Sequence, residues 1–363
     1  MAKRSPLLEL QRLNGGEIRE REDGLVPIHF GDPLAEYHAV ETGVGLFDLF
    51  QRSFLKFSGS DRVSFLNGMV SNDVKPLAPG QGLHAAFLDI QGKILADARI
   101  FCMQEALLVD VPELCKERII QHLERHLVAD EVTIQDLAAD FLMVSLQGPQ
   151  AGPLMREATS IATLPRSELE HLEAAIAEQP LLLIRVTHIC QEGYDLILPR
   201  SEATGMIRRI QEIGNKFSLS WAGTEAQEML RIEAGIPRYG VDMTEDNLLL
   251  ETGLNHAVNF HKGCYLGQEI VERIHSRGHV NKRLVGLILE TKKPANRGEK
   301  VYREDREIGR VTSSAFSPRK RSALALGYVQ HDFSNPGTTV TVKRDEGEIS
   351  AEISSLSLDK TAS

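Results

Sequence analysis

The segment Lys262–Glu269, which reads KGCYLGQE, holds the residues with the clearest chemical potential. Cys264 lies two residues after Lys262 and just before a stretch, starting at Gly267, whose pattern predicts a helix. A nearby ammonium group and a helix N-terminus both favour thiolate over thiol. The segment therefore predicts a reactive pair, Cys264 and Lys262. The alternative is a small buried cysteine with no chemical role.

Two carboxylates interrupt apolar strands. Asp97 lies within residues 94–100 and Asp195 within residues 194–198. Such a carboxylate is paired with an arginine such as Arg99, or it points into a cavity and accepts N–H groups from a heterocycle such as a pterin. The alternative is an outward-facing residue of an alternating strand.

Positive charge gathers after the cysteine. Residues 272–283 carry four Lys and Arg against one acid, Glu272, a net charge of +3 in a chain whose net charge is −10. The segment predicts either a site for an anion, such as a carboxylate tail or a phosphate, or a solvated helix end. Arg231, at the end of a predicted helix, is a further cation that could reach into a cleft. The cluster consists of Arg273, His275, Arg277, His279, Lys282 and Arg283.

The elements that carry these residues follow from apolar patterning. Residues 83–90 and 93–101 predict a β-hairpin turning at Gln91-Gly92. The pattern of residues 167–178 predicts a helix. Residues 237–265 predict a long ordered loop, and loops of this length inside a compact protein are usually functional. Beyond residue 282, short strands separated by turns predict a small closed barrel of roughly 80 residues.

Composition narrows the class of protein. The chain has 363 residues, 42% of them hydrophobic and 25% charged, which excludes a disordered or low-complexity protein. Its acidity argues against nonspecific nucleic-acid binding. No segment has the length of a membrane helix or a signal peptide, and the four scattered cysteines predict a reduced, cytoplasmic protein. We interpret Cys102, Cys115 and Cys190 as structural.

Several familiar sites are missing from the sequence. There is no phosphate-binding loop and no dinucleotide or hydrolase motif. His256 and His261 lie near Cys264, but their spacing fits no structural zinc pattern, so we predict no metal site.

Read together, three segments resemble the folate-binding YgfZ proteins, relatives of the glycine-cleavage T-protein, an aminomethyltransferase. They are residues 230–240 (LRIEAGIPRYG), 251–254 (ETGL) and 262–269 (KGCYLGQE). Shorter pieces along nearly the whole chain agree, from residues 57–62 to residues 326–329.

The resemblance implies an α+β, three-lobed aminomethyltransferase-like fold with a central folate channel and a small C-terminal β-barrel. Residues 1–280 would form the folate-binding region, as two interleaved α+β lobes, and residues 281–358 the barrel. By motif position, Lys262 and Cys264 would be the functional pair, Asp195 would hold the pterin, and Arg231 would contact folate.

The implied function is that of a tetrahydrofolate-binding accessory protein for iron–sulfur enzymes, with client enzymes or assembly factors as partners. Folate would lie in the channel with its glutamate tail near residues 273–283. An alternative is a true aminomethyltransferase, in which Asp97 orients tetrahydrofolate and the aminomethyl donor. Transferases carry two adjacent acids where this chain has Ala96-Asp97. A third possibility is a non-catalytic folate sensor or scaffold.

Overall fold

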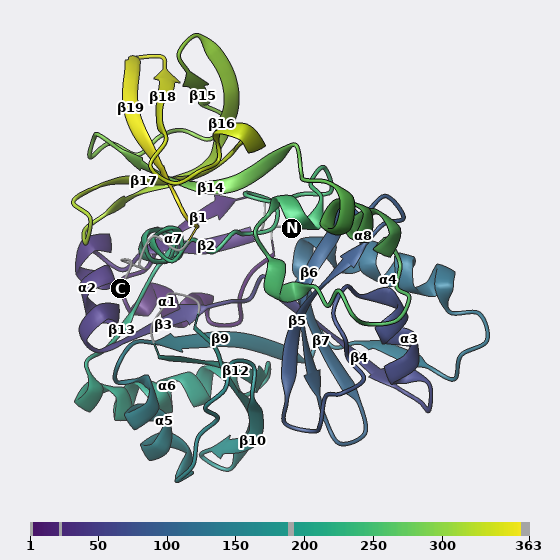
Figure 1. Cartoon of the computed structure of the whole chain (residues 1–363). Helices are drawn as coiled ribbons and strands as arrows, with labels where there is room; N and C mark the ends of the chain where they lie inside the picture. The colour runs from purple at the N-terminus through teal and green to yellow at the C-terminus, as the bar shows by residue number, and fades with distance from the viewer. Residues whose placement is uncertain (1–2, 22–23, 188–191, 357–363) are drawn as a thin grey trace. The chain divides into compact units, whose positions relative to one another are not determined.

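The contacts of the chain divide it into two units. A computed structural model describes residues 3–21, 24–187 and 192–356 (Figure 1). The first unit comprises Met1–Ala85 and Asp97–Gln227, and the second Ala86–Ala96 and Glu228–Ser363. Cys190 lies outside the described residues.

Helices and strands alternate irregularly along the first unit. Its helices are α1 (Leu8–Leu13), α2 (Pro33–Thr42), α3 (Arg62–Met69), α4 (Lys116–His126), α5 (Ala151–Thr159), α6 (Ala203–Gly214) and the start of α7 (Thr224–Glu233). Its strands are β1 (Glu17–Arg21), β2 (Gly24–His29), β3 (Val44–Asp48), β4 (Arg52–Ser58), β5 (Gly82–Leu88), β6 (Ile94–Cys102), β7 (Leu107–Pro112), β8 (Thr133–Asp136), β9 (Phe141–Gln147), β10 (His171–Ile176), β11 (Gln179–Arg185), β12 (Gly193–Pro199) and β13 (Leu219–Trp221).

Two larger sheets organise this unit. One has six strands in the order β10-β11-β12-β9-β3-β13, and the other has five in the order β5-β6-β7-β4-β8. Apolar side chains of both sheets form one buried cluster that includes Phe54, Phe101, Met143 and Ile197. Burial of such side chains is the main stabilising term, so this cluster fixes the strands that carry the charged residues described below.

The helix α6 illustrates why these segments fold as they do. Met206, Ile207, Ile210 and Ile213 recur at helical spacing, and all four are buried in the core that covers the six-stranded sheet. A stripe of this kind places one face of a helix against a sheet and leaves the other in water.

The β5–β6 hairpin is confirmed. Gly92 in its turn has a φ of +73°, a conformation that favours glycine. The Asp89 carboxylate accepts backbone N–H bonds from Gln91 and Lys93, at 2.8 and 2.9 Å, and so holds the turn. Asp97 and Arg99 therefore lie on a strand of fixed register.

The helix predicted over residues 167–178 is wrong. Residues 171–176 form β10, which pairs antiparallel with β11 through a turn at Ala177 and Glu178. Both turn residues have positive φ angles, 50° and 66°. Leu, Glu and Ala favour helices in isolation, but pairing with the apolar strand β11 overrides that preference.

The second unit contains a closed barrel, as predicted. Its strands are β14 (Lys282–Leu289), β15 (Lys300–Arg303), β16 (Arg306–Ser317), β17 (Ser322–Gln330), β18 (Thr339–Arg344) and β19 (Gly347–Ser354), joined in the order β14-β17-β16-β15-β18-β19. Pairing of β14 with β19 closes it. Along β17, Ala325 and Val329 fill the interior, whereas Leu326 and Tyr328 pack outside with Ile232 of α7.

Between α7 and the barrel, residues 237–265 contain short helical turns and isolated β-bridges, and α8 (Gln268–Arg277) follows. This agrees with the predicted long loop and with a helix beginning after Gly267. An α+β class with a C-terminal barrel is thus confirmed. The boundary at residue 280 stays a prediction. Among the described residues, no helix combines the length and the apolarity needed to cross a membrane.

Candidate functional site

Asp97 faces the same side of β6 as Arg99, because alternate residues of a strand share a face. Its Oδ2 lies 3.5 Å from Nε2 of His84 on β5. Its Oδ1 is buried and has no hydrogen-bond partner among the described residues. Buried acceptors are almost always satisfied, so this oxygen marks a place for a donor from a ligand or a water.

Arg99 holds the surrounding acids in place. Its Nε donates to Oδ2 of Asp110, its cross-strand partner on β7, at 2.6 Å, and its Nη1 donates to Oδ2 of Asp195 at 2.7 Å. The Nε of Arg52 donates to the other oxygen of Asp110 at 2.7 Å. Both Asp110 and Asp195 are fully buried. Charges this deep are tolerated only when they are paired and hydrogen-bonded.

This network sets the protonation of Asp97. Burial opposes its ionisation, but the contact with His84 and the charges of Arg52 and Arg99 outweigh burial and lower the pKa of Asp97. Arg99 is likewise desolvated by burial, and the charges of Asp110 and Asp195 raise its pKa. At neutral pH the site therefore presents an ionised carboxylate beside a protonated guanidinium.

Cys264 lies in a different environment. It is an exposed free thiol before α8, whose N-cap residue, Gly267, has a φ of +84°. A Cβ on Gly267 would stand 2.6 Å from the backbone oxygen of Asp89, so only glycine fits there. Lys262 is 7% exposed, and its Nζ lies 5.0 Å from the ring centre of Tyr265. Cation–π attraction thus engages the ammonium group that was predicted to act on Cys264.

Arg231 is buried and clamped by two acids. Its Nε and Nη2 donate to the two carboxylate oxygens of Glu228 at 2.8 and 2.6 Å. Its Nη1 donates to Oδ2 of Asp242 at 2.8 Å and to the backbone oxygen of Ile236 at 3.0 Å. These bonds use four of the five guanidinium donors. Arg231 therefore holds the chain that follows α7.

The described residues of the basic cluster differ in their contacts. Arg273, His275, His279 and Arg283 are exposed, and the side chain of Arg277 lies outside the described part of the structure. His275 stacks on Phe260 and His279 on His331, with ring centres 3.8 and 4.5 Å apart. Lys282 forms an ion pair with Glu251 at 3.6 Å. A folate tail at this cluster stays a prediction.

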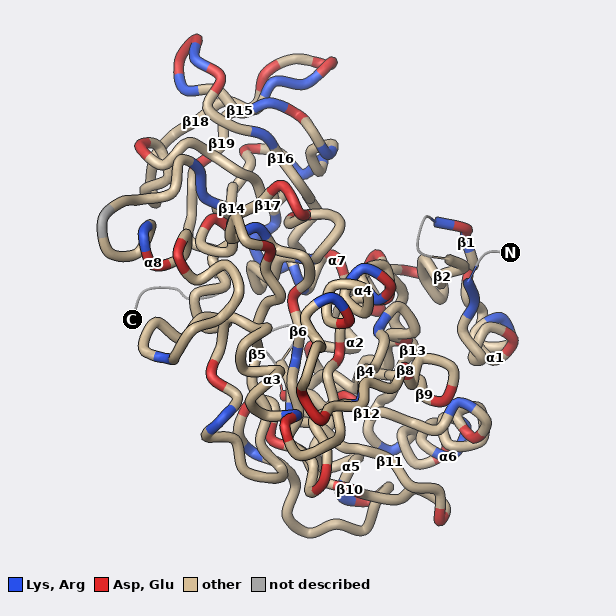
Figure 2. Tube along the Cα trace, turned by 90° about the vertical axis from the view of Figure 1, so that its right-hand side faces the viewer, with Lys and Arg blue, Asp and Glu red and all other residues tan. Residues whose placement is uncertain are grey.

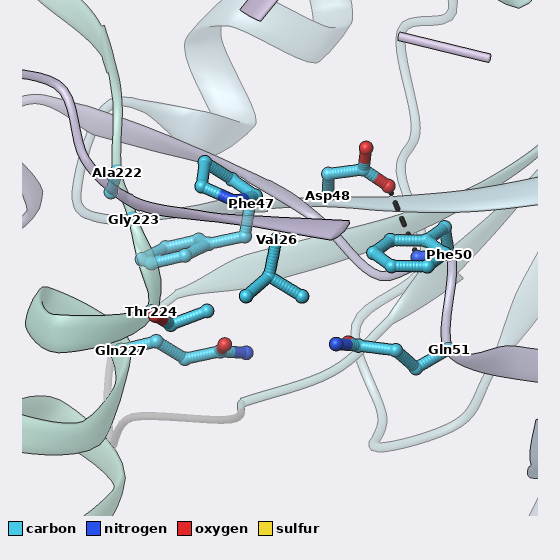
Figure 3. A pocket seen from close by; sticks show the side chains of 10 residues that line it. Val26, Phe47, Asp48, Phe50, Gln51, Ala222, Gly223, Thr224 and Gln227 are labelled. Atoms are coloured by element: carbon cyan, nitrogen blue, oxygen red, sulfur yellow. Dashed lines mark hydrogen bonds between the residues drawn. The ribbon is translucent and has the colours of Figure 1, made fainter. Parts of the chain in front are cut away.

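A small cavity in the first unit carries no site. Gln51 and Gln227 face each other across it, and Asp48 accepts a bond from the backbone N–H of Phe50 at 3.0 Å (Figure 3). Its volume of about 10 Å³ holds at most one water. Within the described chain, no three His, Cys, Asp or Glu residues converge as metal ligands.

The structure brings Asp97 and Asp195 into one network and places Cys264, Lys262 and Arg231 in the other unit. Sequence reasoning missed His84, Arg52 and Asp110. Asp110 carries the same signal as Asp97 and Asp195, a carboxylate inside an apolar strand. His84 and Arg52 have no local signal, because they join the site only through strand pairing.

The sequence and the fold match a known class of protein. The family model "GCVT N-terminal domain" matches residues 15–262, and "Glycine cleavage T-protein C-terminal barrel domain" matches residues 282–359. The solved aminomethyltransferase T of the glycine cleavage system from Bartonella henselae superposes with a TM-score of 0.90 at 24% identity, over 99% of this chain and 98% of that one. This likeness concerns the fold.

Sequence relatives point the same way. The aminomethyltransferase of Rubrobacter xylanophilus is 30% identical over 90% of this chain and 87% of its own length, and that of Bacillus subtilis is 27% identical over 97% and 98%. The chain belongs to the glycine cleavage T-protein family. Aminomethyltransferases use tetrahydrofolate, which agrees with the predicted cofactor. These matches support the aminomethyltransferase alternative better than the iron–sulfur role.

Proposed function

We propose that this protein is a tetrahydrofolate-dependent aminomethyltransferase. Tetrahydrofolate supplies the acceptor for the one-carbon unit, and a lipoyl carrier protein delivers the aminomethyl group. The observation that carries the proposal is the carboxylate of Asp97, which is 14% exposed, has a lowered pKa and keeps one buried oxygen without a partner among the described residues. Family membership along nearly the whole chain supports it.

The residues present fit a reduced pterin. Its ring N–H groups need a buried anionic acceptor, and Oδ1 of Asp97 offers one. Asp97 would bind and orient the ring through that oxygen, and its ionised state leaves it able to accept a proton. His84, which contacts Oδ2, holds the carboxylate in one orientation.

Asp195 and Arg231 act as positioning residues in this proposal. Asp195 accepts a hydrogen bond from Arg99 through one carboxylate oxygen, and this bond connects β12 to β6. Arg231 spends most of its donors on Glu228, Asp242 and Ile236. We infer that each keeps a neighbouring segment in place, and that direct pterin contact falls to Asp97.

The test is formation of methylene-tetrahydrofolate from an aminomethylated lipoyl carrier protein and tetrahydrofolate. Reducing conditions suit the cytoplasmic location that we propose. We expect turnover by the natural protein and a loss of about 10²–10⁴-fold in Asp97→Asn, the usual range for a group that moves a proton. Asp130→Asn, at an exposed acid of the same unit, is the matched control and should keep full activity.

Absence of product with the natural protein would discard the transferase. Tetrahydrofolate binding without turnover would instead support the folate sensor or scaffold.

A second candidate function rests on Cys264. The accessory role for iron–sulfur enzymes, as in YgfZ proteins, requires a reactive thiol within KGCYLGQE, and Cys264 is exposed there. One thiolate contributes to an iron–sulfur site but cannot complete it, so client enzymes or assembly factors would supply the other ligands. The test is to express each variant in a strain that lacks the natural protein and to measure the activity of iron–sulfur enzymes. Cys264→Ser should fail to restore iron–sulfur enzyme activity, and full restoration would exclude the role.

A further inference from the structure

A cavity of about 170 Å³ lies in the second unit, beside the outer wall of the barrel. This volume is several times what one water occupies. Asp242 and Asn247 line it from the loop after α7, and Arg297, Arg310, Thr312 and Tyr328 line it from the barrel. None of these residues belongs to the Asp97 network.

The acid in this cavity is already satisfied. Oδ2 of Asp242 accepts from Nη1 of Arg231 at 2.8 Å and from the backbone N–H of Arg238 at 3.0 Å. Its Oδ1 accepts from the hydroxyls of Thr312 and Ser313, both at 2.6 Å. Asp242 thus fastens the loop to the barrel and has no capacity left to attract a cation.

Neither arginine of the cavity pairs with an acid in the part of the chain that the structure describes. Arg310 is exposed, and its side chain makes no hydrogen bond or ion pair with any described residue. The side chain of Arg297 donates only to the backbone oxygen of Gly240, at 3.2 Å, within the described chain. Acidic residues outnumber basic ones in this chain, and charges of both signs are interspersed along it (Figure 2). Asp242 bonds to Arg231, Thr312 and Ser313 and to neither of these arginines, so two guanidinium groups that pair with no acid among the described residues favour an anion at this cavity.

Tyr328 supplies an independent indication. It is the cross-strand partner of Arg310, so both side chains emerge on the same side of the barrel wall. Tyr328 is 5% exposed, and its hydroxyl is buried without a hydrogen-bond partner among the described residues. Burial raises the pKa of Tyr328, so the hydroxyl keeps its proton and can donate it to an acceptor. The Nζ of Lys282 lies 5.0 Å from the centre of the Tyr328 ring, and it forms an ion pair with Glu251.

We propose that this cavity binds an oxyanion, a carboxylate or a phosphate group, held by Arg297 and Arg310 and by the hydroxyl of Tyr328. Arginine pairs with both groups through parallel N–H bonds, and the tyrosine O–H satisfies a third oxygen lone pair. The satisfied state of Asp242 argues against a metal cation. The charged lining argues against an apolar ligand. The inference does not rest on the proposed transferase activity.

The test is isothermal titration of the full chain with inorganic phosphate and, separately, with glutarate. Binding of one probe or both supports the site and tells a phosphate from a carboxylate ligand. Arg310→Gln should weaken binding at least tenfold, and Tyr328→Phe at least threefold. Lys292→Gln removes an exposed cation of the barrel that does not line the cavity, so the dissociation constant of the probe should change by less than twofold.

Tyr328→Phe removes a hydroxyl that bonds to no described residue, so its melting temperature should not fall. Lack of binding of both probes would overturn the proposal, and so would equal losses in all three variants. Asp97→Asn should bind the probe as the natural protein does, which separates this site from the transferase site.

Discussion

Asp97 and Cys264 are the two residues on which competing functions depend, and their surroundings differ in kind. Asp97 lies on a paired strand two residues from Arg99, whose guanidinium bonds to Asp110 of β7 and Asp195 of β12, and it also feels the charge of Arg52 on β4. Cys264 is exposed in a loop before α8. A carboxylate on a paired strand, with its charge held by neighbouring cations, keeps one position and one charge, which catalysis by orientation requires. An exposed thiol suits exchange with another protein.

We expect the largest effect on the free energy of unfolding, when the charged network near Asp97 is broken. Asp110→Asn would remove the carboxylate that pairs with Arg52 and one of the two carboxylates that pair with Arg99, in a buried place. We expect the free energy of unfolding to fall by about 3–5 kcal/mol. Urea denaturation measures it, with Asp130→Asn as the exposed control. A loss under about 1 kcal/mol would mean that the network is not rigid, and would weaken the contrast with Cys264.

The second prediction compares the reactivity of the exposed thiol of Cys264 with that of the buried thiols of Cys102 and Cys115. Burial raises the pKa of Cys115 to about 11 and also raises that of Cys102. Because alkylation requires an accessible thiolate, Cys264 should react at least about tenfold faster than either. Iodoacetamide labelling followed by peptide mass analysis measures the three rates. Comparable rates at Cys264 and Cys115 would show that the Cys264 segment is covered.

Replacing the exposed thiol should cost little stability. We expect Cys264→Ser to change the free energy of unfolding by less than about 0.5 kcal/mol, as for other surface substitutions. The same urea titration measures it. A loss of about 2 kcal/mol or more is typical of substitutions in a hydrophobic core. It would show that the sulfur is buried, and would remove the basis for the accessory role.

The smallest expected effect concerns pH. Since the pKa of Asp97 lies below its ordinary value of 3.8, its carboxylate stays ionised throughout neutral pH. The stability it contributes is present above that ordinary value and disappears only as pH falls through the lowered pKa. The rate ratio of natural protein to Asp97→Asn should therefore be constant between about pH 6 and 9. An acid limb near pH 6 that vanishes in Asp97→Asn would contradict this protonation state.

Local signals in the sequence located much of this architecture. Alternating apolar residues predicted the β5–β6 hairpin and the barrel, because each pattern reports burial of one face. The strand β10 was missed because its partner β11, and not its own residues, decides its conformation. The same limit applies to the site. Asp97 is visible as an acid in an apolar strand, but Arg99 joins Asp195 across 96 positions of sequence. Only the fold makes that pairing.

The affinity of tetrahydrofolate for the natural protein and for Asp97→Asn tests the central claim most directly. If the partnerless oxygen of Asp97 accepts an N–H group of the pterin, Asp97→Asn loses a charge-assisted hydrogen bond. Such a bond contributes about 1.5–3 kcal/mol, so Kd should rise by about 10- to 150-fold. Equal dissociation constants for the two proteins would show that the pterin does not meet Asp97, and would contradict this account of the site.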